Sequence, residues 1–181
     1  MKNLYCLLDN HSDHKINTVL SDNLSWISAH FDTLLTESVP VAFSGENVLR
    51  YLFTQIKDHI IKGLNDSGFS QEEQDFLGKG WLPEQMKPSE FISKRIQLIS
   101  QVIDKYPEFQ HLLCLCKRQM FLDQCHKKGI RLQGLEHKQY IPGNGIFEPI
   151  VRRDDAFYQN TLQAIDASKK GVFVIIGPIR G

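Results

Sequence analysis

The sequence has little of what marks the specialised classes of protein. Its four cysteines in 181 residues are too few and too unevenly spread for a disulfide framework. Basic and acidic residues balance at 21 each, without the basic block that a nucleic-acid surface needs. No apolar run approaches the roughly 18 residues of a membrane-spanning helix, and the first ten residues do not form a secretory signal. We therefore expect a cytoplasmic protein that binds neither nucleic acid nor a membrane.

The remaining composition is that of a globular domain. Hydrophobic residues make up 41% of the chain and charged residues 23%, which is enough apolar material for a core. The spacing of Cys114, Cys116 and Cys125 superficially suggests a metal site. A helix would direct the first two thiols to opposite sides, so we interpret these cysteines as buried apolar side chains.

Strand patterns alternate with helical patterns along the chain. Short apolar runs predict strands at residues 3–8, 39–43, 130–135 and 172–176. Longer periodic segments predict helices at 15–35, 46–64, 70–77, 89–106, 107–128 and 154–170. This alternation indicates an α/β fold that is rich in helix, with a short, mainly parallel sheet of about four strands. We expect a single α/β domain over residues 1–181, with a large helical insertion at 46–128.

Polar residues follow each predicted strand. Asp9, His11 and His14 follow the first strand, Glu46 follows the second, Glu136 and His137 follow the third, and Arg180 follows the last. Arg152 and Arg153 open the last helix. In open parallel sheets, ligands bind beyond the carboxyl ends of the strands, because loops and helix N-termini converge there. We therefore expect these side chains to lie near one edge of the sheet.

The residues after the first strand allow two chemistries. Asp9, His11 and His14 offer one carboxylate and two imidazoles, a donor set that suits a divalent metal ion. Alternatively, Asp9 orients His11 as a general base by fixing its tautomer. A purely structural role is also open, since such residues begin helices and Glu46 would complement a helix dipole.

The order of these stretches resembles a known superfamily. The stretches are LDNH at 8–11, VAFSGE at 41–46, GIRLQGLE at 129–136, Arg153 with its helix, and VFVIIGPIR at 172–180. They are similar to the conserved segments of the Tiki proteases, TraB proteins, ChaN-like haem-binding proteins and erythromycin esterase-like hydrolases. In that superfamily the first strand ends in Gly-Glu-x-His and the last runs into Gly-x-x-His. This chain has Leu8, Asp9 and Arg180 at three of those positions.

The resemblance implies a metal-assisted hydrolase with an altered site. Asp9, His11 and Glu46 would hold the ion or activate a water molecule. Arg153 and Arg180 would bind the anionic part of a small-molecule or peptide substrate, because arginine donates hydrogen bonds but does not ligate metals. A divalent metal is the expected cofactor, ahead of haem.

The second hypothesis is a catalytically inactive scaffold. Such a protein would keep the fold and bind a protein partner through its helical insertion. Phe69, Phe76 and Trp81 lie around a glycine loop of that insertion and are the candidate contact residues. For each of them, packing in the core is the alternative role, and the more common one.

Overall fold

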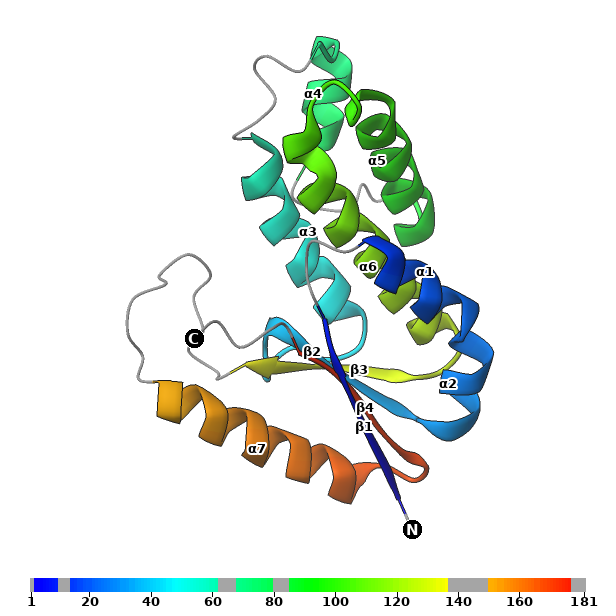
Figure 1. Ribbon diagram of the computed structural model, residues 1–181, viewed down its shortest axis with the longest axis vertical. Helices are drawn as coiled ribbons and strands as arrows, with labels where there is room; N and C mark the ends of the chain where they lie inside the picture. Colours follow the sequence, from blue (N-terminus) through cyan, green and yellow to red (C-terminus); the bar gives the residue numbers. More distant parts are fainter. Residues whose placement is uncertain (1, 10–13, 62–67, 80–84, 137–149, 177–181) are drawn as a thin grey trace. The chain divides into compact units, whose positions relative to one another are not determined.

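The chain folds as α/β in the computed structural model, which describes residues 2–9, 14–61, 68–79, 85–136 and 150–176. The described residues form one four-stranded sheet in the order β1-β4-β2-β3, and all neighbouring strands are parallel (Figure 1). This confirms the predicted fold class. The strands are β1 (Asn3–Leu8), β2 (Thr33–Pro40), β3 (Arg131–Glu136) and β4 (Gly171–Ile176).

Helices occupy most of the chain between the strands. None in the described part has the length and apolar character needed to cross a membrane. They are α1 (His14–Asp22), α2 (Leu24–His30), α3 (Glu46–Ile61), α4 (Gln71–Leu77), α5 (Pro88–Val102), the 3-10 helix η1 (Pro107–Phe109), α6 (Gln110–Lys127) and α7 (Ile150–Ala167).

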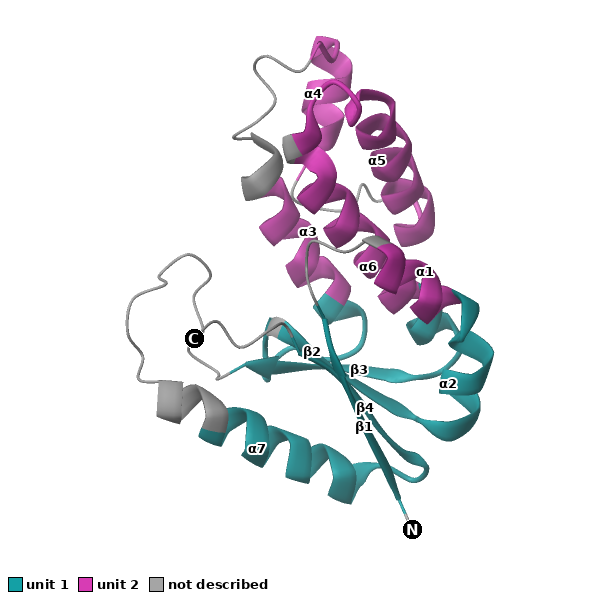
Figure 2. Ribbon diagram, viewed as in Figure 1, with its two compact units in different colours: residues 1–10, 22–48, 124–181 teal, residues 11–21, 49–123 magenta. Residues whose placement is uncertain are grey.

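The chain divides into two compact units (Figure 2). Unit 1 contains the sheet and comprises residues 1–10, 22–48 and 124–181. Unit 2 is helical and comprises residues 11–21 and 49–123. Unit 2 therefore takes its second segment from the predicted insertion and its first from the opening of the chain, just after β1.

The sheet of unit 1 has apolar layers on both faces. On one face, α7 contributes Ala164 to a core with Leu35, Leu135, Val172 and Val174. On the other face lie aromatic rings from β1, β4 and the region of α2: Tyr5 stacks on Phe173 at 5.1 Å between ring centroids, and Phe31 meets Phe173 edge-on at 5.4 Å. Burial on both faces explains why the central strand β4 is a continuous apolar run.

The predicted helix at 15–35 is wrong in its second half. The chain forms α1 and α2 and then enters β2 at Thr33. Leu34 and Leu35 fit both a helical stripe and a buried strand, and both are fully buried in β2. Pairing with β3 on one side and β4 on the other decides between the two, which a local pattern cannot reveal.

Two boundaries also differ from the predictions. The strand expected at 39–43 is β2, which begins six residues earlier and ends at Pro40. The last helix begins at Ile150, not at Asp154 or Asp155, so these acidic residues lie inside α7 and do not cap it. The strands predicted at 3–8, 130–135 and 172–176 correspond closely to β1, β3 and β4.

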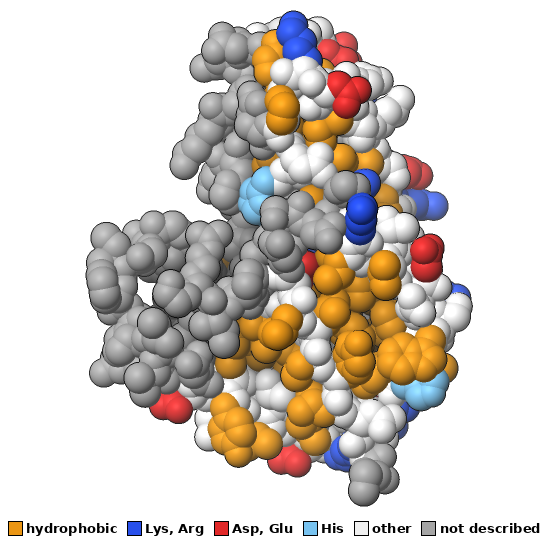
Figure 3. All heavy atoms as spheres, in the orientation of Figure 1, with side chains coloured by type: hydrophobic (Ala, Val, Ile, Leu, Met, Phe, Trp, Pro, Cys, Tyr) orange, Lys and Arg blue, Asp and Glu red, His pale blue; other side chains and the backbone are white. Residues whose placement is uncertain are grey.

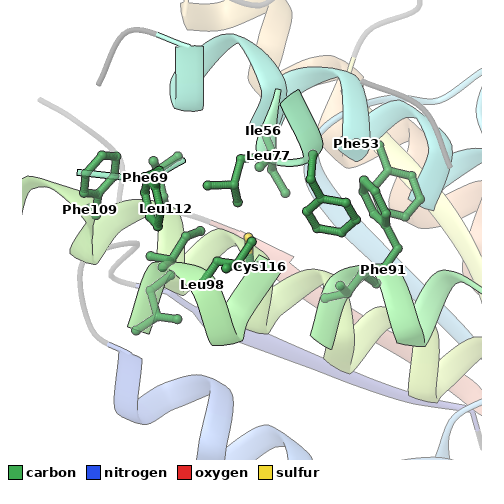
Figure 4. Packing of buried hydrophobic residues seen from close by; sticks show 13 residues of the cluster. Phe53, Ile56, Phe69, Leu77, Phe91, Leu98, Phe109, Leu112 and Cys116 are labelled. Atoms are coloured by element: carbon green, nitrogen blue, oxygen red, sulfur yellow. The ribbon is translucent and has the colours of Figure 1, made fainter. Parts of the chain in front are cut away.

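Unit 2 has its own apolar core between α3, α4, α5 and α6 (Figure 4). Phe69 and Phe76, two of the predicted partner contacts, are 8% and 6% exposed and belong to this core. Packing against Phe109 and Phe91 removes them from solvent, so of the two roles that the sequence allows they take the core role and are not surface contacts. Trp81 lies outside the described residues.

A fully buried arginine sits within this core. The guanidinium of Arg95 packs 4.5 Å from the ring centroid of Phe91, and its Nη2 donates to the carbonyls of Leu77 and Lys79, at the end of α4. Burial lowers the pKa of Arg95 to about 10. The favourable contacts are the aromatic ring and the negative end of a helix dipole, which partly offset the desolvation of the charge.

Candidate functional site

The carboxyl ends of the parallel strands form one edge of the sheet in unit 1, and two acidic residues lie there. Asp9 directly follows β1 and its backbone N–H donates to the carbonyl of Ile176 at 2.7 Å. This hydrogen bond continues the pairing of β1 with β4 by one residue. The Asp9 side chain is only 3% exposed. A buried carboxylate at a strand end is uncommon, because desolvating the charge is unfavourable.

Glu136 occupies the equivalent position at the end of β3. Its side chain is 1% exposed, and its carbonyl accepts a hydrogen bond of 2.9 Å from the N–H of Val41. That bond holds the turn after β2 against the end of β3. Glu136 is thus fixed by backbone pairing at the same edge of the sheet as Asp9.

Helix α7 is attached to the same strand end. The side chain of Asn160, which is 9% exposed, donates from Nδ2 to the carbonyl of Leu135 at 2.9 Å. We did not single out Asn160 from the sequence. The available signal was its position three residues after Phe157 and four before Ala164, which makes it a polar residue on the apolar face of a helix.

The strand next to β3 is irregular near this edge. The pairing of β2 with β3 shifts register between Thr36 and Pro40. At that point Gly134 of β3 passes so close to β2 that a Cβ atom would lie 2.0 Å from the carbonyl oxygen of Pro40. Such bulges redirect the chain and occur often beside functional sites.

The strand order sets the spacing of the two acidic residues. β1 and β3 are the two outer strands, with β4 and β2 between them. Neighbouring strands are about 4.8 Å apart, so three steps separate Asp9 from Glu136 by roughly 14 Å. One metal ion cannot contact both carboxylates at this spacing, whereas an extended substrate can lie across both.

Glu46 does not lie at this edge, and its expected position is corrected. After the turn at Val41 the chain runs back antiparallel to β3: Gly134 N–H donates to Phe43 O, and Gly45 N–H donates to Leu132 O at 2.8 Å. Leu132 precedes Glu136 by four residues, or roughly 13 Å along a strand. Glu46 is exposed in the first turn of α3, where a carboxylate complements the helix dipole.

Arg153 lies in the first turn of α7, and its position follows from the course of the helix backbone. It precedes Asn160 by seven residues, so the helical repeat puts its α carbon on the side of α7 that carries Asn160. Since α7 follows β3, this first turn lies beyond the carboxyl end of that strand.

The other residues predicted for the site are described by the structure only in part or not at all. His11 and Arg180, together with His137, lie outside the described residues. His14 is the first residue of α1, but its side chain is not among those described. Within the described residues, no three His, Cys, Asp or Glu side chains gather as a metal site would require. The set of Asp9, His11 and His14 therefore stays a prediction from spacing.

Comparison of the chain with protein-family models, curated proteins and solved structures found no match. The resemblance to the Tiki, TraB, ChaN and erythromycin esterase-like superfamily accordingly rests on the sequence segments alone.

Proposed function

We propose that this chain is a hydrolase that acts on an anionic small molecule or peptide at the carboxyl edge of its sheet. One observation carries the proposal: the carboxylates of Asp9 and Glu136 are buried at the ends of two parallel strands. This edge is where parallel sheets bind ligands, and carboxylates are suited to activating water. Glu136 takes the place that the sequence pattern gave to Glu46.

In the proposed mechanism, residues near the end of β1 activate water and residues near the end of β3 bind the substrate. On the β1 side, Asp9 accepts a proton from the attacking water as general base. A divalent metal held by Asp9 with His11 and His14 would lower the pKa of that water. On the β3 side, Arg153 binds the negative group of the substrate, and Asn160 keeps α7 fixed to the strand end so that Arg153 stays in position.

The state of the cysteines supports the cytoplasm as the compartment of this chain. None of the four forms a disulfide, and three of them are buried, as expected for thiols in a reducing environment. The proposed partner is therefore a cytoplasmic small-molecule or peptide substrate.

The experiment compares wild type with Asp9→Asn and Glu136→Gln on a panel of chromogenic esters, phosphoesters and peptides. The assays are run with added manganese or zinc and with a chelator. Each substitution keeps the size of the side chain and removes its ability to take a proton. We expect hydrolysis to fall by about 100-fold or more in Asp9→Asn, in the range typical of a lost general base.

The control is Asp166→Asn, an exposed carboxylate at the other end of α7. It should hydrolyse the same substrates at the wild-type rate. Circular dichroism and thermal melting establish that every variant is folded. Unchanged turnover in folded Asp9→Asn would contradict the proposed mechanism. A wild type that binds no metal and hydrolyses nothing in the panel would favour the inactive, protein-binding scaffold.

A further inference from the structure

Strand β1 has an open hydrogen-bonding edge. It is the first strand in the sheet order, and among the described residues it pairs with β4 alone. The N–H groups of Asn3 and Asp9 donate to β4 residues or to Lys170 just before that strand. Because hydrogen bonding alternates along a strand, the N–H and C=O groups of Leu4, Cys6 and Leu8 point away from β4.

The side chains around this edge are apolar and exposed on both faces of the sheet. Leu4 and Leu8 are 51% and 69% exposed and share the α7 face with their register partners Val172 and Ile176. Tyr5, 45% exposed, lies on the opposite face. Figure 3 shows hydrophobic side chains gathered over this part of unit 1. The ring of Trp26 in α2, which is 45% exposed, meets Tyr5 with 6.0 Å between the ring centroids.

The strand lacks the features that usually protect an edge from pairing. Asn3–Leu8 contains no charged residue and no proline, and its register with β4 runs without a bulge. Edge strands of this kind readily add a further strand. We propose that β1 pairs antiparallel with β1 of a second copy of this chain, which joins the two sheets across a two-fold axis.

The sequence of β1 is complementary to itself in this arrangement. In an antiparallel pair, two residues directly opposite each other have their side chains on the same face of the sheet. They also turn their backbone N–H and C=O groups in matching directions, both toward or both away from the partner strand. The residues of β1 whose backbone groups point away from β4 therefore lie opposite one another in the proposed pair. Centring the two-fold axis at Cys6 places Leu4 opposite Leu8 of the second copy and Tyr5 opposite Leu7. The most exposed leucines of each chain then cover each other, with no like charges opposed.

The antiparallel arrangement also forms a closed pair, because one two-fold axis brings the same edge of each chain against its copy.

The first measurement is sedimentation velocity of the full chain across the micromolar range. Wild type should sediment as a dimer, and the double variant Leu4→Lys/Leu8→Lys should sediment as a monomer. Both leucines are more than half exposed, so the lysines can be accommodated in the folded chain. The matched control is Val19→Lys, which changes a 57% exposed side chain of α1 and should leave the dimer unchanged.

The second measurement tests the register. The α carbons of opposed Cys6 residues would lie about 5.5 Å apart, within reach of a disulfide. Mild oxidation or a short bis-maleimide should therefore link two wild-type chains, whereas Cys6→Ser and the double lysine variant should stay unlinked. A wild type that is monomeric throughout, a dimer that survives in the double variant, or a dimer that is not linked through Cys6 would each overturn the proposal.

Discussion

Burial divides the four cysteines into two kinds of thiol. Cys6 is exposed, whereas Cys114, Cys116 and Cys125 are buried. Burial raises the pKa of Cys116 and of Cys125 to about 12 and also raises the pKa of Cys6. Since the thiolate is the reactive form, the thiols of Cys116 and Cys125 are protected both by low access and by low ionisation, and Cys114 is protected by its burial.

We therefore expect one thiol per chain to react with Ellman's reagent in the native protein and all four to react after denaturation. The measurement is made at low protein concentration, so that self-association does not cover Cys6. Cys6→Ser should show no native reaction. Rapid reaction of any thiol in native Cys6→Ser would contradict the burial of the other three cysteines.

Asp32, which immediately precedes β2, is hydrogen-bonded to residues at the starts of β3 and β4, at the amino end of the sheet. Its carboxylate accepts the N–H groups of Lys169 at 2.7 Å and Lys170 at 3.1 Å, just before β4. Its own backbone bonds to Gly171 and Arg131, the first residues of β4 and β3. Burial raises the pKa of Asp32, but the backbone hydrogen bonds outweigh this and lower it overall.

A lowered pKa makes the stabilising effect of Asp32 depend on pH. The contribution is fully present above the unfolded pKa of about 3.9 and is lost as pH falls through the lower folded value. Asp32→Asn should lower the Tm at neutral pH by about 3 to 6 °C, equivalent to about 1 to 2 kcal/mol. Its Tm should also fall less steeply than that of wild type below pH 4. Thermal melts across this range, with Asp166→Asn as control, test both expectations; parallel pH curves for wild type and Asp32→Asn would contradict them.

At the scale of elements, the contact between β2 and β3 depends on one glycine. The Cβ of any other residue at position 134 would lie 2.0 Å from Pro40 O and 2.4 Å from Val39 O. Because both are backbone atoms of a paired strand, neither can move as a flexible side chain would. The bulge in β2 and the glycine in β3 therefore depend on each other.

Gly134→Ala should lower the free energy of unfolding by about 3 kcal/mol or more, since it forces these two strands apart. Urea unfolding measures the change. Gln133→Ala, which alters the neighbouring residue of the same strand, should change the free energy by about 1 kcal/mol or less. Equal stability of Gly134→Ala and wild type would mean that the two backbones are not this close.

Elements with strong local signals were predicted well. Ser70 and Glu73 form the capping box that begins α4, with hydrogen bonds of 3.3 and 2.8 Å between each side chain and the other residue's N–H. Gly129, two residues after the last residue of α6, adopts a φ of 81°, a conformation that favours glycine at a helix end. β2 was misplaced because Leu34 and Leu35 suit a helix equally well, and only their pairing with β3 and β4 makes them part of a strand.

At the scale of the whole molecule, the candidate site was predicted in part. Asp9 and Glu136 follow strands that the sequence identifies, and both lie at the carboxyl edge as the parallel topology requires. Glu46 was expected beside them because a residue soon after a strand normally lies at that strand's end. The return of residues 43–45 along β3 moves it away, and this return depends on hydrogen bonds to a strand almost ninety residues later in the chain.

The sequence by itself determined the α/β class, three of the four described strands and the burial of three cysteines, because hydrophobic periodicity and short-range capping specify these locally. The tertiary structure alone decided the order of the strands, the position of Glu46 and the exposure of β1. Each of these depends on which distant segments pair or pack together. The pairing of distant segments is decided by the free energy of the whole fold, so it cannot be predicted from a short stretch of residues.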